Sequence, residues 1–415
     1  MSGSVALRTV APWGAIIVAM GLFVFQTISL RGYVSSDFHI FYDAAARSVV
    51  DFSAIYKDGW KVDVSKDAAT LKGFLYPPPG VLAFVPLLLG DKSQAFAVFS
   101  ALALLAAALS IWIWIRLMIR HDVAAPARPE IVAMMLLALT TAPVFINRGG
   151  QVGTFILLFS VLGVALGNGR RGWIGGAFLA LGGWIKIYPG LLLLAIPLRK
   201  QWRPAAIGFA VTAVAIPLAS LIVIPLEIYT QYFSVLLPTM SGRAIVNIDN
   251  QSLAAIWLRA QDTGFDARTS FAALPISGLV STSFALATFG TIAAFVLRTR
   301  STCNGFVPVT AVIMAVIGPL APLGWGHSYI FILPALVTVL AIGWERQDAK
   351  AVSAALVAWA MVVIPSHSRL PNDLVPELVA QIFYARYAIA TVILIAQLWR
   401  LCGRAALKRP EDRPI

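Results

Sequence analysis

The chain has 415 residues, of which 59% are hydrophobic and only 12% are charged, and its formal net charge is +13. Apolar runs of about 15 to 24 residues recur from end to end, which excludes a soluble globular protein and predicts an all-α polytopic membrane protein. The lysines and arginines gather in short connections, so the positive charge indicates membrane topology and not nucleic acid as a partner. We expect one integral membrane domain over residues 1–415, with the lipid bilayer around it.

Basic segments divide the sequence into about twelve transmembrane helices. The first apolar run is interpreted as a retained span and not a signal peptide, because it is long and lacks a convincing cleavage pattern. Placing all basic segments on one side makes both termini cytoplasmic, together with a tail of about residues 400–415. The predicted spans are approximately 12–31, 93–115, 130–146, 151–167, 172–186, 187–198, 204–226, 274–297, 305–322, 328–343, 350–364 and 377–399.

Two long loops, about 32–92 and 227–273, lie on the opposite, outer side. Pro77 to Gly90 is apolar but short and begins with three prolines, so it is predicted to lie along the outer interface. Residues 38–50 are predicted to form a helix that is either interfacial or packed on the transmembrane bundle. Its apolar face holds Phe38, Phe41, Tyr42, Ala45 and Val49.

Residues 172–198 are too few for two full crossings at about 1.5 Å per helical residue. The segment Lys186-Ile187-Tyr188-Pro189-Gly190 contains proline and glycine, so it predicts two half-depth helices that meet there. Such a break must line a cavity, because its backbone groups need hydrogen-bonding partners.

Two basic residues, Lys186 and Arg386, stand well inside apolar segments. A charge at that depth costs at least about 2.5–3.5 kcal/mol unless it is paired or hydrated. No acidic residue has a comparable depth, so we expect both side chains to bind a substrate phosphate, with snorkelling towards water as the alternative.

Asp37 and His327 are candidates for proton transfer. Asp37 follows the first span, where a carboxylate can meet both a lipid-linked and a water-borne substrate, and His327 lies in a tight outer turn after Trp325. An imidazole exchanges protons near neutral pH more readily than a carboxylate, whose unperturbed pKa is about 3.9. Trp325 can stack on a sugar.

Amide side chains in the outer loops are candidates for binding a polyhydroxylated ligand, because they offer both donors and acceptors. As turn and capping residues they would need no ligand. They are Asn147, Gln151, Asn250 and Gln251.

No single motif is decisive, but several short motifs occur in order along nearly the whole chain. They are Asp37 with Phe41 and Tyr42, Ile55-Tyr56, Tyr76-Pro77-Pro78, Gly150-Gln151, Lys186 with Pro189, and Trp325 with His327. In this order and spacing the chain resembles glycosyltransferase family 87, also catalogued as family of unknown function 2029.

The resemblance implies the type C glycosyltransferase fold, with two interfacial helices in the first outer loop. It implies transfer, with inversion, of a sugar from a polyprenyl-phosphate donor to a glycolipid or glycan acceptor on the outer face of the bacterial cytoplasmic membrane. Mannose is the expected sugar, and the alternatives are arabinose or a hexose other than mannose.

Site roles follow from the same resemblance. His327 is expected to be the general base, and Asp37 to orient the acceptor or share that role. Lys186 is expected to hold the donor phosphate. Independently of the resemblance, Arg386 is expected to assist because of the depth of its charge, and the substrate is expected to meet Tyr42, Tyr76 and Trp325 together with the four amides.

Two other classes of protein remain open. A lipid-linked-sugar transporter or flippase also uses broken helices, but no convincing internal repeat supports it. A surface-polysaccharide polymerase or ligase shares lipid-linked substrates and large outer loops, and only the ordered motifs speak against it.

Overall fold

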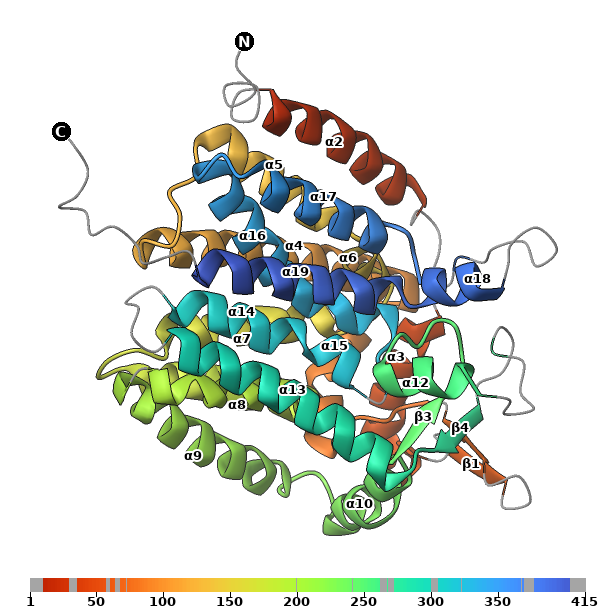
Figure 1. Cartoon of the computed structure of the whole chain (residues 1–415). Helices are drawn as coiled ribbons and strands as arrows, with labels where there is room; N and C mark the ends of the chain where they lie inside the picture. The colour runs from red at the N-terminus through yellow and green to blue at the C-terminus, as the bar shows by residue number, and fades with distance from the viewer. Residues whose placement is uncertain are drawn as a thin grey trace.

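The structure is a computed structural model that describes residues 10–29, 36–56, 60–63, 68–71, 73–198, 200–240, 242–261, 267, 272–299, 305–321, 323–366, 368 and 377–403. These residues form a bundle of helices with a small antiparallel sheet at one end (Figure 1). The last part of the predicted cytoplasmic tail, residues 404–415, lies outside the described residues.

The helices of the first half of the chain include several short 3₁₀ segments, labelled η. They are α2 (Ala11–Ser29), α3 (Ser36–Val50), η1 (Phe52–Ala54), η3 (Pro78–Leu89), α4 (Lys92–Arg120), α5 (Arg128–Leu139), α6 (Ala142–Arg148), α7 (Gly153–Leu166), α8 (Gly172–Ile185), η4 (Tyr188–Leu198), η5 (Lys200–Trp202) and α9 (Arg203–Ser220).

The second half of the chain begins with a segment that contains the π-helical turn η6. Its helices are α10 (Leu226–Gln231), η6 (Tyr232–Leu236), α11 (Leu237–Met240), α12 (Leu253–Arg259), α13 (Gly278–Thr299), α14 (Phe306–Ala315), α15 (Ile317–Leu320), η7 (Gly326–Ile332), α16 (Leu333–Glu345), α17 (Ala349–Val363), α18 (Glu377–Tyr384) and α19 (Arg386–Gly403).

Five helical stretches of the described residues are long and apolar enough to cross a membrane, which agrees with a polytopic membrane protein. A sixth candidate is the pair α5 and α6, which is bent by 59°. Other apolar helices are shorter, so the count of twelve spans stays a prediction. The five stretches are Ala11–Ile28, Lys92–Arg120, Lys200–Ser220, Gly278–Thr299 and Gly326–Glu345.

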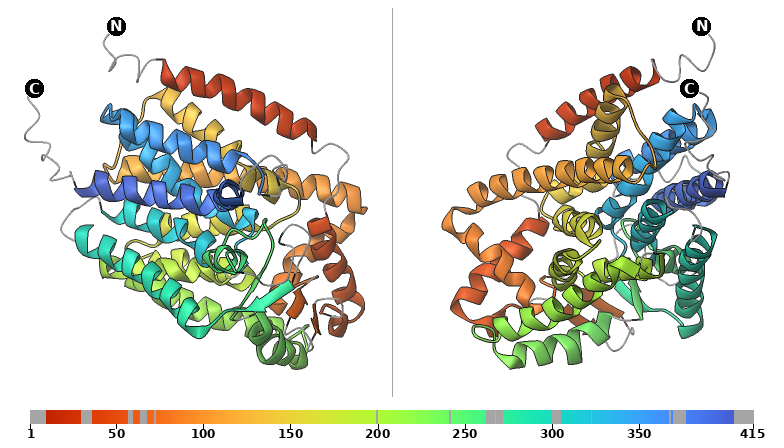
Figure 2. Two further views of the ribbon diagram at one scale, coloured as in Figure 1. Left: turned by 45° about the vertical axis from the view of Figure 1, so that its right-hand side comes forward. Right: turned by 90° about the vertical axis from the view of Figure 1, so that its left-hand side faces the viewer.

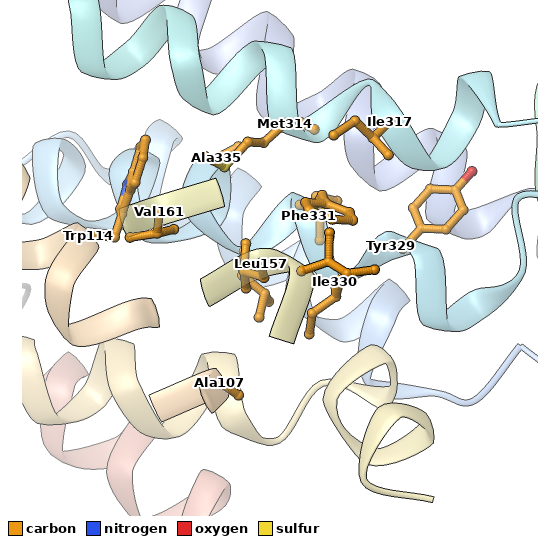
Figure 3. Close-up of a cluster of buried hydrophobic side chains, with 14 of the residues drawn as sticks. Ala107, Trp114, Leu157, Val161, Met314, Ile317, Tyr329, Ile330, Phe331 and Ala335 are labelled. Atoms are coloured by element: carbon orange, nitrogen blue, oxygen red, sulfur yellow. The ribbon is translucent and has the colours of Figure 1, made fainter. Parts of the chain in front are cut away.

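Helix α16 forms the centre of the bundle, because every side chain from Leu333 to Trp344 is buried. Its neighbours α4, α7 and α14 contribute apolar side chains to the same core (Figure 3). Within this core the indole of Trp114 donates a hydrogen bond to Thr338 Oγ1 at 3.0 Å, which satisfies a buried donor. By contrast, α2 lies at the edge of the bundle in both views of Figure 2.

The predicted helix break at Lys186 is confirmed. Helix α8 ends at Ile185, Lys186 has an extended backbone, and the 3₁₀ helix η4 starts at Tyr188. Pro189 cannot donate an intrahelical hydrogen bond, which explains why α8 does not continue.

Helix α3 packs on the bundle through its apolar face. The Phe38 ring lies 5.3 Å from that of Phe96 and 5.4 Å from that of Phe99, both in α4. Phe41 stacks on Phe84 of η3 at 4.6 Å. This agrees with the alternative of a packed helix, although Val49, which we placed on the same face, is 64% exposed.

A four-stranded antiparallel sheet joins the two long loops that were predicted to lie on the outer side. The sequence analysis did not predict this sheet. Its order is β1-β2-β4-β3, where the first loop supplies β1 (Trp60–Asp63) and β2 (Ala68–Leu71), and the second supplies β3 (Arg243–Ile245) and β4 (Ala272–Pro275). The contact between the loops is the pairing of β2 with β4. In Figure 1 the sheet lies at the end of the bundle opposite the start of α2 and the end of α19.

Candidate functional site

Lys186 and His327 come together although they are far apart in the sequence. Lys186 lies in the break after α8, and His327 is the second residue of η7. Lys186 Nζ lies 3.2 Å from His327 Nε2, within hydrogen-bond distance. The histidine is 7% exposed and the lysine is half-buried. Because an ammonium group only donates, a charged Lys186 requires that Nε2 be the unprotonated ring nitrogen.

Tyr76 and Asp37 complete the neighbourhood of this pair. The Tyr76 ring lies 5.4 Å from Lys186 Nζ, in cation–π geometry, and its hydroxyl donates to Gln151 Oε1 at 3.2 Å. Asp37, in the first turn of α3, is close enough to Lys186 and Tyr76 to act on both electrostatically. Burial, and then the negative charge of Asp37, raise the pKa of Tyr76. The three principal predicted residues therefore share one site.

Tyrosines extend this site along the outer loops, and the sequence analysis assigned none of them a role. The Tyr56 hydroxyl donates to the Tyr76 carbonyl at 2.7 Å, and its ring stacks on that of Tyr232 at 6.1 Å. Tyr188 lies near both Tyr76 and Tyr232. Burial raises the pKa of Tyr232 to about 12, so its hydroxyl stays protonated and able to donate. Tyr56 and Tyr188 lie inside motifs that could have identified them.

Asn147 holds the backbone of the catalytic candidate His327. Its Nδ2 donates to the His327 carbonyl at 3.0 Å and to the Pro143 carbonyl at 2.7 Å. A Cβ on Gly153 would lie 2.5 Å from Asn147 Oδ1, so glycine is needed for this approach. The fully buried Asn147 amide therefore acts on the site through the backbone.

Asn250 and Gln251, in the loop predicted over residues 227–273, support the turn that contains Trp325 and His327. Asn250 forms a β-bridge with Trp325, and the backbone nitrogen of Gln251 donates to the Gly324 carbonyl at 2.9 Å. The Gln251 side chain accepts a hydrogen bond from the Tyr387 amide nitrogen at 2.9 Å. Both predicted ligand-binding side chains are fully buried, whereas Trp325 is half-buried.

Arg259, at the end of α12, is a residue that the sequence analysis missed. Its guanidinium donates to the carbonyls of Asn247 at 2.7 Å, Asn250 at 2.6 Å and Tyr384 at 3.3 Å. Burial lowers its pKa to about 10. The arginine thus ties the 247–250 turn to the end of α18, and a charged residue in a polar loop gave no sequence signal for this role.

The side chains of Arg386 and Tyr42 form hydrogen bonds with residues other than Lys186 and His327. The Arg386 guanidinium donates to the carbonyls of Phe383, Ile364 and Pro365. These contacts favour a role in joining α17 to α19 over phosphate binding. The Tyr42 hydroxyl donates to the Gly90 carbonyl at 3.1 Å.

The described residues contain no group of three or more histidine, cysteine, aspartate or glutamate side chains that could hold a metal ion. The described residues of the site offer a cation, an imidazole, a carboxylate and several phenols. This set can bind a phosphate, remove a proton from a hydroxyl and stack on a sugar.

Comparison with known proteins identifies the class to which this fold and site belong: the chain is a member of glycosyltransferase family 87, whose model matches residues 74–321, well over half of its length. The family predicted from the ordered motifs is thereby confirmed, and the protein is a glycosyltransferase. The chain is also similar to a particular enzyme of Mycobacterium tuberculosis, the polyprenol-phosphate-mannose-dependent alpha-(1-2)-phosphatidylinositol mannoside mannosyltransferase. The two are 27% identical over 323 residues, which cover 73% of this chain and 69% of the relative.

Proposed function

We propose that this glycosyltransferase transfers mannose from a polyprenyl-phosphate donor to a glycolipid acceptor, with inversion at the anomeric carbon. The observation that carries the proposal is the contact between Lys186 and His327, next to Asp37, in a chain of this family. A phosphate-binding cation, a base and a carboxylate suffice for a single displacement. The specificity of the mycobacterial relative supports the donor and the sugar.

Lys186 binds the donor phosphate in this mechanism. As the bond between the anomeric carbon and the phosphate oxygen breaks, negative charge builds on the leaving group, and an ammonium ion held beside it stabilises that charge. The Tyr76 ring, under Lys186 Nζ, keeps the cation in place without neutralising it.

His327 removes the proton from the acceptor hydroxyl. Its Nε2 has one lone pair, which the hydrogen bond from Lys186 occupies in this structure. Arrival of the donor phosphate draws the ammonium towards the phosphate oxygens and frees Nε2 for the acceptor. The donor therefore binds first.

Asp37 and the neighbouring aromatic residues position the acceptor. A carboxylate accepts hydrogen bonds from sugar hydroxyls, and half-buried aromatic rings such as Tyr76 and Trp325 offer faces on which a sugar can stack. Asn147, Asn250 and Gln251 act as positioning residues, because their hydrogen bonds hold the backbone of the turn at residues 324–327.

We assign the site to the outer face of the bacterial cytoplasmic membrane. The basic segments, and with them both termini, are expected to be cytoplasmic. The sheet, α3 and α12 lie at the opposite end of the bundle from the start of α2 (Figure 1).

Reconstitution of the purified protein in lipid nanodiscs tests this function. We expect transfer of radiolabelled mannose from polyprenyl-phosphate-mannose to phosphatidylinositol mannoside, and none from a nucleotide sugar. Turnover with the nucleotide sugar alone would overturn the donor class. Movement of the intact donor across a proteoliposome membrane without sugar transfer would instead establish a flippase.

A further inference from the structure

Arg148, the last residue of α6, carries a buried charge that the proposed mechanism does not use. The residue is 6% exposed. Its Nη1 donates to Thr27 Oγ1 of α2 at 3.4 Å, a long hydrogen bond, and its guanidinium carbon lies 5.7 Å from the centroid of the Phe23 ring. The buried Nε has no hydrogen-bond partner.

No carboxylate of the described residues forms an ion pair with Arg148. A guanidinium has five N–H donors in a planar fork. In Arg148 one Nη1 donor meets Thr27, and the buried Nε–H has no acceptor. A buried cation of this kind is expected to have an anionic partner, because desolvation is costly when the charge is unpaired. An anionic ligand can supply that partner.

The position of Arg148 indicates where that ligand comes from. Thr27 lies in the last turn of α2, a candidate membrane span, and α2 lies at the edge of the bundle in both views of Figure 2. A span ends at the level of the lipid headgroups, where the abundant anion is phosphate. Gln26 fixes α2 to the bend after α5, because its Nε2 donates to the Thr140 carbonyl at 2.8 Å.

The neighbouring residue connects this cation to the reaction centre. Asn147 precedes Arg148 on α6 and hydrogen-bonds to the backbone of His327, the proposed base. Arg148 thus lies one residue along α6 from the group that holds the turn of that base, and a lipid with its phosphate at Arg148 has its headgroup on the same helix. The donor phosphate is already assigned to Lys186, which leaves the acceptor.

We propose that Arg148, with Thr27, binds the phosphodiester of an anionic glycolipid acceptor at the end of α2. The site is distinct from the donor-phosphate site at Lys186, and it makes the enzyme select acceptors that carry a negatively charged headgroup. This inference rests on the proposed function, since it concerns the acceptor of the same reaction.

The test compares two acceptors that differ in charge, phosphatidylinositol mannoside and the neutral octyl α-mannoside. For Arg148→Gln we expect the KM of the anionic acceptor to rise about 10- to 100-fold, with the KM values of the donor and the neutral acceptor unchanged. Arg148→Lys should lose less, because it keeps the charge without the planar fork. Arg298→Gln is the control, since Arg298 stacks on Trp399 at 4.2 Å, remote from the site, and should alter neither KM.

A binding measurement separates this inference from the proposed function. Spin-labelled phosphatidylinositol should associate with the wild-type protein more strongly than spin-labelled phosphatidylcholine, and Arg148→Gln should abolish the difference. An equal rise in KM for both acceptors, or lipid binding without a charge preference, would overturn the site. If inorganic phosphate alone displaces the labelled lipid, Arg148 binds a free anion and the proposed lipid site is wrong. A wild-type protein that prefers the anionic lipid but transfers no mannose would instead refute the proposed function.

Discussion

The Nζ atom of Lys186 lies 3.2 Å from the Nε2 atom of His327, so the proposed phosphate ligand and the proposed base share one hydrogen bond. The contact joins the break after α8 to the turn before α16. While Lys186 donates to Nε2, that nitrogen cannot accept a proton from a substrate. Donor binding and activation of the base are thereby coupled through a single lysine side chain.

Substitution of Lys186 tests this coupling. Lys186→Met should raise the donor Kd about 10- to 100-fold, because charge-assisted hydrogen bonds contribute about 1.5–3 kcal/mol each. Equilibrium binding of a non-hydrolysable polyprenyl-phosphonate sugar measures this directly. Lys92→Met, which removes a half-exposed lysine paired with Asp43, is the control and should leave the Kd unchanged. An unaltered donor Kd in Lys186→Met would remove the phosphate role.

His327→Gln should act on the chemical step. The amide keeps a hydrogen-bonding group near Lys186 but cannot take up a proton, so kcat should fall about 10²- to 10⁴-fold. Donor Kd should stay near the wild-type value. Single-turnover kinetics separates the two quantities, and near-normal kcat would exclude His327 as the base.

Asp37→Asn distinguishes an orienting carboxylate from a second base. If Asp37 orients the acceptor, the variant should raise the acceptor KM and retain part of kcat, because an amide still hydrogen-bonds to a hydroxyl. Loss of kcat on the scale of His327→Gln with normal acceptor KM would instead give Asp37 the base role.

Gly153→Ala should damage the site without touching a predicted catalytic residue. Its Cβ would lie 2.5 Å from Asn147 Oδ1, which forces the asparagine away from the His327 carbonyl. We expect a loss of about 1–3 kcal/mol in unfolding free energy and a lower kcat. The matched control is Gly290→Ala, where a Cβ meets nothing within 4 Å. Equal thermal stability and activity of the two variants would contradict the close approach.

Arg259→Met should loosen the turn that supports Trp325. The variant removes the three hydrogen bonds to backbone carbonyls, so we expect a loss of at least about 2 kcal/mol in stability. The acceptor KM should rise more than the donor KM, because Trp325, a proposed acceptor residue, pairs with this turn. Arg259→Lys, which keeps the charge, should recover part of both effects.

The sequence was sufficient to predict the family, the helix break at Lys186 and the grouping of Asp37, Lys186 and His327. Charge and helix breakers are local signals in an apolar chain, so they remain visible without a structure. The β-sheet was not predictable, because its strands have only three or four residues and the two loops pair across about half of the chain. The role of Asn147 became clear only from its burial and its hydrogen bonds on α6, since the sequence does not tell whether an asparagine amide binds a sugar or a backbone carbonyl.

The pairing of β2 with β4 has a consequence for biosynthesis. Residues 68–71 leave the ribosome long before residues 272–275, so β2 has no partner on its β4 side while much of the bundle is being inserted. His327 is translated later still, and Lys186 meets its imidazole only after both outer loops have emerged. A chain truncated after α13 should therefore contain the sheet but lack the contact that unites the proposed active site.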